Sequence, residues 1–504
     1  MNPLVKLSLP VFVFINALAY SQDYVNPNSA SNAGGLNSGV DYFNKKDYKN
    51  AMLQLEPLAN TGDVEAEDYL GRCYYEVKSY NKALKWFEKA ANKNNPDAQF
   101  NLGCFYEAGF GVKMDLPRAV LYYRQAAEQG NMYAQYNLGL CFDYGNGVDA
   151  DSYMAVAWYK KAAEQGYILA ARTLGEYYMN GNNDVKRDSE ESVKWYRIGA
   201  EKGDMESEFY LAVAYDLGDG VKQNNNEAIS WYEKAALQGD TGSAYNIGCI
   251  YLLGSAEIRD TQKAIQWFQK AADKGWPDAE YNLGVAYANG AGVERDSAKA
   301  LNWFGRAARH GSSDAQYNLA TAYYLGQGLK KDLKEAFYWY KEAAEQGDTD
   351  AAFDLGGCYA KGEGTSVNVD KAYDWYQVAA NLGMPDAECA VADCFINGTG
   401  VYKNTPEGFR WYKKAADQND AEGEAGVAYC YLQGLGVVKD EKEAFTWYQK
   451  AAEQGNAEGE CGLGYCYWYG TGVDKNILLS KSWYEKAAAL GNKDAKDALQ
   501  NLIK

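Results

Sequence analysis

The residues of this 504-residue chain that are most able to do chemistry are ten cysteines and one histidine, His310. Thiolates and imidazoles hold zinc when several of them converge, usually from C-x-x-C or Cys-His motifs. The sequence contains no C-x-x-C, and one imidazole cannot supply the usual histidine ligands. We therefore predict no metal site and no cofactor, and we interpret His310 as a solvated turn residue.

Four of the cysteines recur at an interval of 36 residues, at Cys358, Cys394, Cys430 and Cys466. Equivalent residues on neighbouring parallel helices would lie about 8 to 10 Å apart, whereas a disulfide needs Cα atoms within about 7 Å. Other copies of the repeat place Phe105 or Ala286 here, which indicates a core position. We expect buried free thiols, and disulfide pairing in an exported chain stays an open alternative.

Two other motifs could belong to an enzyme. The segment from Ser79 to Lys82 matches S-x-x-K, but the companion S-D-N and K-T-G elements are absent. Gly-x-Gly recurs, for example at Gly326 and Gly328, without the further glycine or Gly-Lys that a phosphate loop needs. A Ser-His-Asp triad could use only His310. We interpret Gly-x-Gly as a turn and predict no catalytic residue.

These motifs all lie within an internal repeat of about 36 residues, marked by recurring glycines such as Gly311, Gly347 and Gly383. In the unit 313–348, apolar residues at helical spacing predict a first helix up to about Leu325. Gly-x-Gly then turns the chain, and Asp332 begins a second helix as its N-cap. The unit is a helical hairpin, which is too short to bury its apolar face without stacking on further copies.

The second helix of this unit has a stripe of aromatic and small residues. The aromatic members are expected to fill the wedge between successive hairpins, while the alanines let neighbouring helices approach closely. The stripe consists of Ala336, Trp339, Tyr340, Ala343 and Ala344.

The full pattern, A-x-x-x-L-G-x-x-Y-x-x-G-x-G-V-x-x-D-x-x-K-A-x-x-W-Y-x-K-A-A-x-Q-G, resembles the Sel1-like repeat, a relative of the tetratricopeptide repeat. Segments 134–166, 279–311 and 315–347 match it well, and we count twelve units from about Val64 to Asn492. The resemblance implies an all-α protein, an α/α solenoid of about thirteen stacked helical hairpins.

Five segments are expected along the chain. Residues 1–22 contain an apolar run followed by Ala17-Leu18-Ala19, which is typical of a secretory signal peptide. Residues 23–38 read as a flexible leader, 39–95 as tetratricopeptide-like or degenerate hairpins, 96–492 as the Sel1-like array, and 493–504 as a capping helix. We expect export to a periplasm or the medium, with no membrane insertion after signal cleavage.

The formal net charge of the chain is −18. A surface this acidic repels phosphate backbones and anionic lipid headgroups, so we expect no nucleic-acid partner.

One face of each first helix is less polar than a solvent-facing helix should be. Counted from the Leu-Gly pair, the positions three before, one after and four after the glycine lie about 100° or more from the centre of the core stripe. Many of them are aromatic, and an asparagine recurs beside them. The candidate partner-binding residues are Tyr136, Tyr245, Tyr281, Tyr317, Tyr324, Tyr429, Leu432, Tyr465, Trp468, Asn137, Asn246, Asn282 and Asn318.

Two explanations of this stripe stay open. Tight superhelical curvature could pack the side chains against their neighbours, or they could line a concave groove for an extended peptide or an amphipathic helix. Glycan stacking is a weaker possibility. We expect a monomeric, exported protein-protein interaction scaffold that binds a protein or peptide partner without catalysis. The family resemblance implies an alternative, a cell-wall- or β-lactam-related hydrolase or binder, because cysteine-rich Sel1-like proteins have been linked with penicillin binding and β-lactam hydrolysis.

Overall fold

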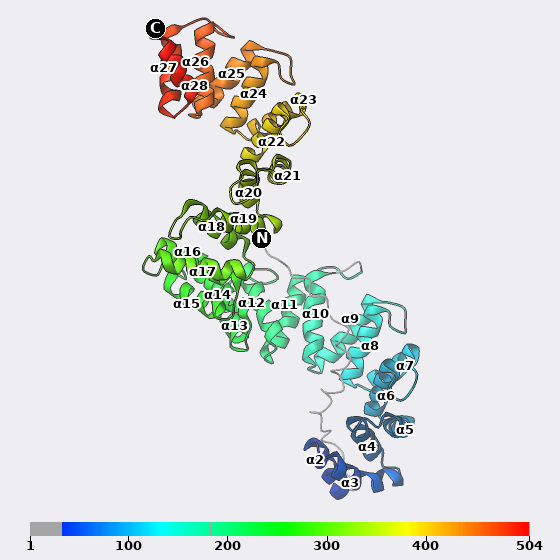
Figure 1. Ribbon diagram of the computed structural model, residues 1–504. Coiled ribbons are helices and arrows are strands. Elements are labelled where there is room, and N and C mark those ends of the chain that lie inside the picture. Colours follow the sequence, from blue (N-terminus) through cyan, green and yellow to red (C-terminus); the bar gives the residue numbers. More distant parts are fainter. Residues whose placement is uncertain (1–32, 182–183, 503–504) are drawn as a thin grey trace. The chain divides into compact units, whose positions relative to one another are not determined.

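The computed structural model describes residues 33–181 and 184–502, and these residues form 27 α-helices and no strand. The expected signal peptide at 1–22 and the first part of the expected leader, up to residue 32, lie outside the described residues. The chain divides into two compact units, residues 1–243 and 244–504. Within each unit, helical hairpins follow one another along the chain (Figure 1). The predicted all-α solenoid of hairpins is confirmed.

Each hairpin has a first helix and a second helix. The first helices are α2 (Ala33–Asn44), α4 (Val64–Glu76), α6 (Pro96–Ala108), α8 (Met132–Tyr144), α10 (Ile168–Asn180), α12 (Met205–Leu217), α14 (Thr241–Leu253), α16 (Pro277–Asn289), α18 (Ser313–Leu325), α20 (Thr349–Lys361), α22 (Pro385–Asn397), α24 (Ala421–Gln433) and α26 (Ala457–Tyr469). The second helices are α3 (Tyr48–Thr61), α5 (Tyr80–Asn92), α7 (Leu116–Glu128), α9 (Ser152–Glu164), α11 (Ser189–Glu201), α13 (Asn225–Leu237), α15 (Thr261–Ala272), α17 (Ser297–Arg309), α19 (Leu333–Glu345), α21 (Val369–Asn381), α23 (Thr405–Ala416), α25 (Glu441–Glu453) and α27 (Ile477–Ala489). The last helix, α28 (Lys493–Leu502), packs on α27 and α26. Helix α2 begins at Ala33 and so includes the end of the segment expected to be a leader.

The predicted hairpin at 313–348 is present as α18 and α19. The Asp332 carboxylate caps α19 by accepting hydrogen bonds from the backbone N–H groups of Lys334 and Glu335. Tyr340 and the alanines of the predicted stripe are buried. Trp339 is only half-buried, because its ring lies at the rim of the core in an edge contact with the exposed Tyr338, 4.9 Å between centroids.

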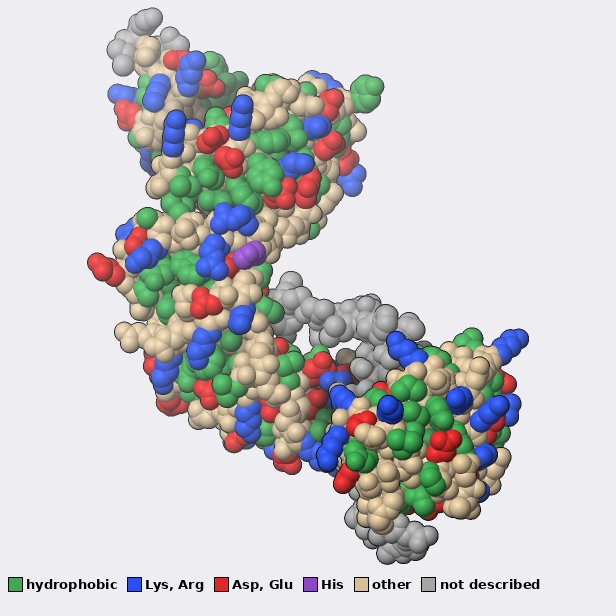
Figure 2. Space-filling view, turned by 60° about the horizontal axis from the view of Figure 1, so that its bottom comes forward, with side chains coloured by type: hydrophobic (Ala, Val, Ile, Leu, Met, Phe, Trp, Pro, Cys, Tyr) green, Lys and Arg blue, Asp and Glu red, His purple; other side chains and the backbone are tan. Residues whose placement is uncertain are grey.

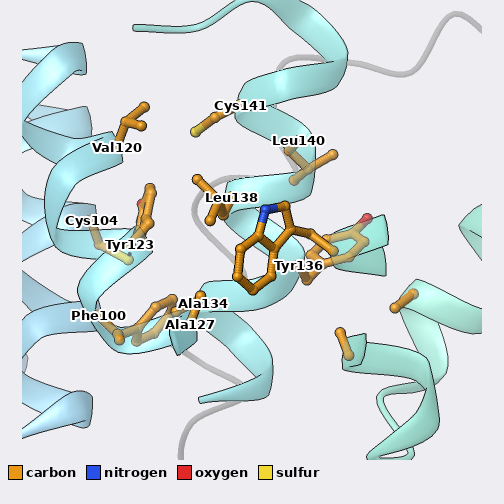
Figure 3. Close-up of a cluster of buried hydrophobic side chains, with 14 of the residues drawn as sticks. Phe100, Cys104, Val120, Tyr123, Ala127, Ala134, Tyr136, Leu138, Leu140 and Cys141 are labelled. Atoms are coloured by element: carbon orange, nitrogen blue, oxygen red, sulfur yellow. Dashed lines mark hydrogen bonds between the residues drawn. The ribbon is translucent and has the colours of Figure 1, made fainter. Parts of the chain in front are cut away.

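The core lies between the two helices of a hairpin and the next hairpin along the chain. In the first unit, Figure 3 shows the aromatic rings of Phe100, Tyr123 and Tyr136 together with aliphatic and cysteine side chains. In many hairpins a glycine of the first helix packs against the aromatic ring of the second helix: a Cβ added to Gly139 would lie 2.5 Å from the ring of Tyr159. The L-G pair in the repeat therefore reflects close contact between a helix backbone and an aromatic ring.

The Gly-x-Gly turns have a structural function. Both glycines adopt positive φ, +77° at Gly470 and +71° at Gly472, for example. A Cβ on the second glycine would overlap the backbone carbonyl of the first residue in the preceding second helix, which is Glu441 for Gly472 and Leu333 for Gly364. The turn of one hairpin thus rests on the helix start of the previous one.

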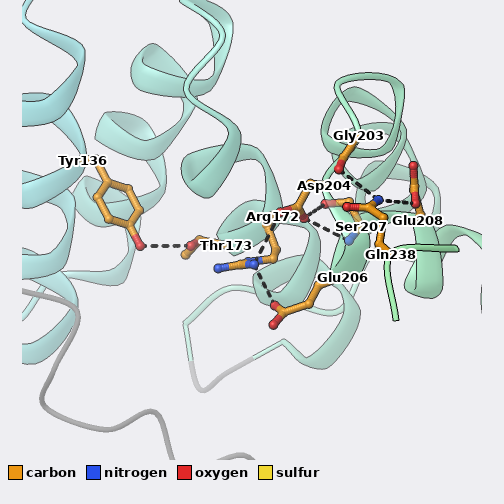
Figure 4. Close-up of polar contacts among 9 residues, drawn as sticks. All are labelled: Tyr136, Arg172, Thr173, Gly203, Asp204, Glu206, Ser207, Glu208 and Gln238. Carbon is orange, nitrogen blue, oxygen red and sulfur yellow. Dashed lines mark hydrogen bonds and ion pairs between the residues drawn. The ribbon is translucent and has the colours of Figure 1, made fainter. Parts of the chain in front are cut away.

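A side-chain bond closes most hairpins at their other end. The residue just before the closing glycine reaches back 30 residues to the first helix, as Gln129 does to Gln99 (2.6 Å) and Gln346 to Gln316 (2.7 Å). Gln238 donates in this way to Glu208, and also to the carbonyl of Gly203 (Figure 4). These bonds satisfy polar groups in the first turn of each first helix.

Candidate partner-binding surface

The candidate residues lie on one face of the first helices, which we call the first-helix face. On each helix it comprises a first-turn position followed by residues three, seven and ten positions further on, as in Glu422, Ala425, Tyr429 and Leu432 of α24. A spacing of three and four residues keeps these side chains on one side of a helix. The structure shows what fraction of each side chain is exposed to solvent.

On α8 of the first unit the candidate residues of this face are packed. Tyr136 is only 6% exposed: its ring lies 5.4 Å from that of Tyr159 and 5.1 Å from that of Tyr167, and its hydroxyl bonds to Thr173 (Figures 3 and 4). Asn137 is likewise buried, at 4% exposure. Superhelical packing accounts for these two residues, and we leave them out of the binding surface.

The asparagine positions bond to neighbouring hairpins. The Asn101 amide donates to Asp68 (3.0 Å), and the Asn318 amide donates to the hydroxyl of Tyr281 (3.4 Å). An amide that is used in this way is not free to pair with a ligand backbone, so Asn101 and Asn318 connect neighbouring hairpins. Asn246 and Asn282 are half-buried.

Tyr245, Tyr281, Tyr317 and Tyr324 in the second unit are half-buried. The ring of Tyr317 packs 5.8 Å from that of Tyr340, and the hydroxyl of Tyr324 donates to Glu363 (2.9 Å). Each of these tyrosines has part of its ring exposed to solvent and the remainder packed against the core.

The end of the second unit is different, because its tyrosines are exposed. Tyr429 is 45% exposed and Tyr465 is 38% exposed, and Leu432 and Trp468 are half-buried beside them. Tyr469, which the sequence interpretation missed, is 64% exposed, with its ring centroid 4.7 Å from that of Tyr465. We call these five residues the tyrosine patch. Their helices adjoin, since α24 contacts both α22 and α26.

Small residues lie on the core side of the helices that carry the patch. Gly462 places the backbone of α26 directly against the ring of Tyr448, and Cys430 and Cys466 fill the core below Tyr429 and Tyr465. The larger tyrosine rings are left on the outer side of their helices. Figure 2 shows hydrophobic side chains reaching the surface among charged ones on the face in view.

Acidic residues line the start of the same helices. One carboxylate occupies the second position of α16, α18, α20, α22, α24, α26 and α28, and we call this set the carboxylate ladder: Asp278, Asp314, Asp350, Asp386, Glu422, Glu458 and Asp494. In the part of the chain that the structure describes, no lysine or arginine forms an ion pair with any of them.

The ladder carboxylates repel one another electrostatically. Burial raises the pKa of Glu422, and the negative charges of Asp393, Asp386 and Glu458 raise it further. Burial likewise raises the pKa of Glu458, with Asp494 adding to the effect. The first-helix face at this end therefore carries a field of uncompensated negative charge.

The raised pKa values of these carboxyl groups predict how the stability of the folded chain depends on pH. A carboxyl whose pKa is higher in the folded chain than in the unfolded chain binds more protons when folded, so stability falls as pH rises through that range. The melting temperature followed by circular dichroism should therefore rise between pH 7 and pH 5. The variant Glu422→Gln/Glu458→Gln should show a smaller rise. A lower melting temperature at pH 5 than at pH 7 would contradict this reasoning.

The residues considered for catalysis do not assemble a site. The Lys82 ammonium lies over the ring of Tyr74, 5.2 Å from its centroid, and within the described residues no side-chain hydrogen bond joins it to the Ser79 hydroxyl; the two residues are linked only by the backbone bond from Lys82 N–H to the Ser79 carbonyl. His310 is more than a solvated turn residue, because it takes the place of the usual glutamine and pairs with the buried Glu280 (2.7 Å), which also binds Arg306 (2.8 Å).

All ten cysteines are free thiols, and eight of them are buried. Burial raises the pKa of Cys430 and of Cys466 to about 12, so these thiols stay protonated and unreactive at neutral pH. No group of three or more His, Cys, Asp or Glu residues in 33–181 or 184–502 is placed to hold a metal ion. Of the helices that the structure describes, none has the length and apolar character needed to span a membrane.

Comparisons with known proteins agree with this architecture. The family model for the Sel1 repeat matches twelve consecutive segments: 64–95, 96–131, 133–167, 168–204, 206–240, 242–276, 277–312, 313–348, 349–384, 385–420, 421–456 and 457–492. The first match falls in the segment expected to hold degenerate hairpins. No curated protein sequence matched the chain.

Solved structures of repeat proteins are similar to this one. The crystal structure of c5321, a protective antigen present in uropathogenic Escherichia coli strains that displays an SLR fold, is 34% identical with a TM-score of 0.63, over 83% of this chain and 90% of that one. A Sel1 repeat protein from Oxalobacter formigenes is 29% identical with a TM-score of 0.39, over 74% of this chain and 97% of its own. Helicobacter pylori cysteine rich protein B is 27% identical with a TM-score of 0.22, over 26% of this chain and 94% of its own.

Proposed function

Because the chain belongs to the Sel1 repeat family, whose members generally bind protein partners, we propose that it is a non-catalytic scaffold that holds a protein or peptide partner on the tyrosine patch. Within the patch, Tyr429, Tyr465 and Tyr469 are the anchors. The observation that carries the proposal is the exposure of Tyr429 and Tyr465 at a position where other hairpins place smaller residues, such as Thr321 and Gly357.

Tyrosine and tryptophan suit this role for physical reasons. They bring a large contact area with few rotatable bonds, so less conformational entropy is lost when they are immobilised. Such residues contribute most of the binding energy in many protein interfaces. The helices beneath them are held by hairpin packing, so the anchors are positioned before the partner arrives.

Export is part of the proposal and rests on the first 22 residues of the sequence, which have the composition of a secretory signal peptide. The partner would then be met in a periplasm or outside the cell. A protein of this kind needs no cofactor, and the protonated buried thiols described above fit a packing role for the cysteines.

The test is crosslinking and affinity capture with the chain lacking residues 1–22. Tyr465→Ala/Trp468→Ala should weaken the capture of a specific partner at least tenfold, about 1.4 kcal/mol or more, because the anchor Tyr465 and the neighbouring patch residue Trp468 are both removed. A matched control is Tyr338→Ala, which removes an exposed tyrosine from the second helix α19. If the double variant captures every partner as the parent does, the patch is not the binding site.

A further inference from the structure

The tyrosine patch and the carboxylate ladder lie on the same face of the same helices. On α24, Glu422 precedes Tyr429 by seven residues, and on α26, Glu458 precedes Tyr465 by seven, which is two helical turns. A spacing of seven residues places both side chains on one face of their helix. Aromatic anchors and carboxylates therefore form one surface.

The negative charge of this surface is not neutralised by the chain itself. The lysines of the neighbouring second helices are engaged with tryptophan rings: the ammonium of Lys450 lies 3.8 Å from the centroid of Trp447, and that of Lys486 lies 3.8 Å from that of Trp483. The helix dipole favours an acid in each first turn. It does not offset the repulsion between carboxylates of neighbouring helices.

Resting on the proposed function, we propose that the occupant of this surface is an extended, basic segment of the partner protein, with a lysine or arginine at about every third residue. Its cations pair with the carboxylate ladder at Asp386, Glu422 and Glu458, and its other side chains pack on the tyrosine patch. Binding brings positive charge to a place where the folded chain has an uncompensated excess of negative charge.

The spacing of the cations follows from the spacing of the helices. Packed helices lie about 8 to 10 Å apart, and α24 contacts α22 before it and α26 after it. A polyproline II chain advances about 3.1 Å per residue with three residues per turn, so every third side chain points to the same side. Three ligand residues thus span the distance from one carboxylate to the next. Guanidinium groups also stack favourably on tyrosine rings, which favours arginine over lysine near Tyr465 and Tyr469.

The experiment uses the chain without residues 1–22 and a fluorescein-labelled peptide of twelve residues, with arginine at every third position and serine and alanine between. Fluorescence anisotropy gives its affinity. The parent chain should bind this peptide at least tenfold more tightly than a peptide with four consecutive arginines, and it should not bind the version with glutamate in place of arginine. Affinity should fall as salt is added.

Two variants with the same change in net charge distinguish specific pairing with the carboxylate ladder from non-specific attraction between the acidic chain and the basic peptide. Asp386→Asn/Glu422→Gln/Glu458→Gln removes three ladder carboxylates and should weaken binding at least tenfold. The control Asp370→Asn/Glu443→Gln/Glu453→Gln removes three exposed carboxylates from second helices and should change affinity less than twofold. Circular dichroism checks that both variants are folded.

Three results would overturn the proposal: no binding of the spaced arginine peptide, equal binding of the clustered one, or equal losses in the two triple variants. Failure of this proposal can be distinguished from failure of the proposed scaffold function. If Tyr465→Ala/Trp468→Ala loses its captured partner while the ladder variant retains it, the scaffold function stands and the basic occupant is wrong.

Discussion

Tyr159→Ala should lower the free energy of local unfolding around α8 and α9 by about 3 to 5 kcal/mol, the cost of deleting a large aromatic side chain from a packed core. Tyr159 is fully buried, and its ring is in close contact with Gly139 and Tyr136. Amide hydrogen exchange should report the loss as faster exchange throughout the two helices. Hairpins far along the chain should be little affected, because each repeat contacts only its neighbours.

Tyr159→Phe is the control for this prediction. It keeps the ring and removes only a hydroxyl that donates to Asp143 at 3.2 Å. Asp143 retains a shorter bond from the hydroxyl of Tyr177, 2.8 Å. The phenylalanine variant should therefore lose about 1 kcal/mol or less. Equal losses in the two variants would mean that the hydroxyl, and not ring packing, holds this hairpin together.

Gly472→Ala should cost about 2 to 4 kcal/mol of local stability. Part of the cost is the positive φ of +71°, which a residue with a Cβ adopts reluctantly. The rest comes from overlap between the new Cβ and the Glu441 carbonyl oxygen, which forces the turn away from the start of α25. Hydrogen exchange of 441–476 would show the change.

Gly455→Ala is a matched control, because its φ is +77° and an added Cβ would meet no atom within 4 Å. It bears the backbone cost alone, about 1 kcal/mol. The difference between the two variants measures the contact between one hairpin's turn and the preceding hairpin. If the variants unfold alike, that contact contributes nothing to stability.

The hairpins could be predicted from the sequence because the same pattern of residues recurs many times at a nearly constant spacing. Apolar spacing, the Asp332 cap and the Gly-x-Gly turn each indicate the same boundaries, and the structure has α18 and α19 within a residue or two of them. When local signals agree in this way, the fold follows from pattern alone.

The exposure of the candidate residues could not be predicted, because it depends on what the next hairpin contributes. Tyr136 is covered by Tyr167, which lies 31 residues further on. At the same offset from Tyr281 and from Tyr317 the chain has Ser312 and Asp348, whose side chains are too small to cover a ring. Tyr136 and Tyr281 occupy equivalent positions of the repeat, so the sequence pattern does not distinguish them. Their solvent exposure nevertheless differs.

The locality of the helix contacts has a consequence for how the chain is made. Within each unit, helices pack on the next helix in sequence or on the one after it. Such a low contact order lets folding proceed without bringing distant segments together. A hairpin that emerges from the ribosome finds its packing partner already in place, so the array can fold one hairpin at a time.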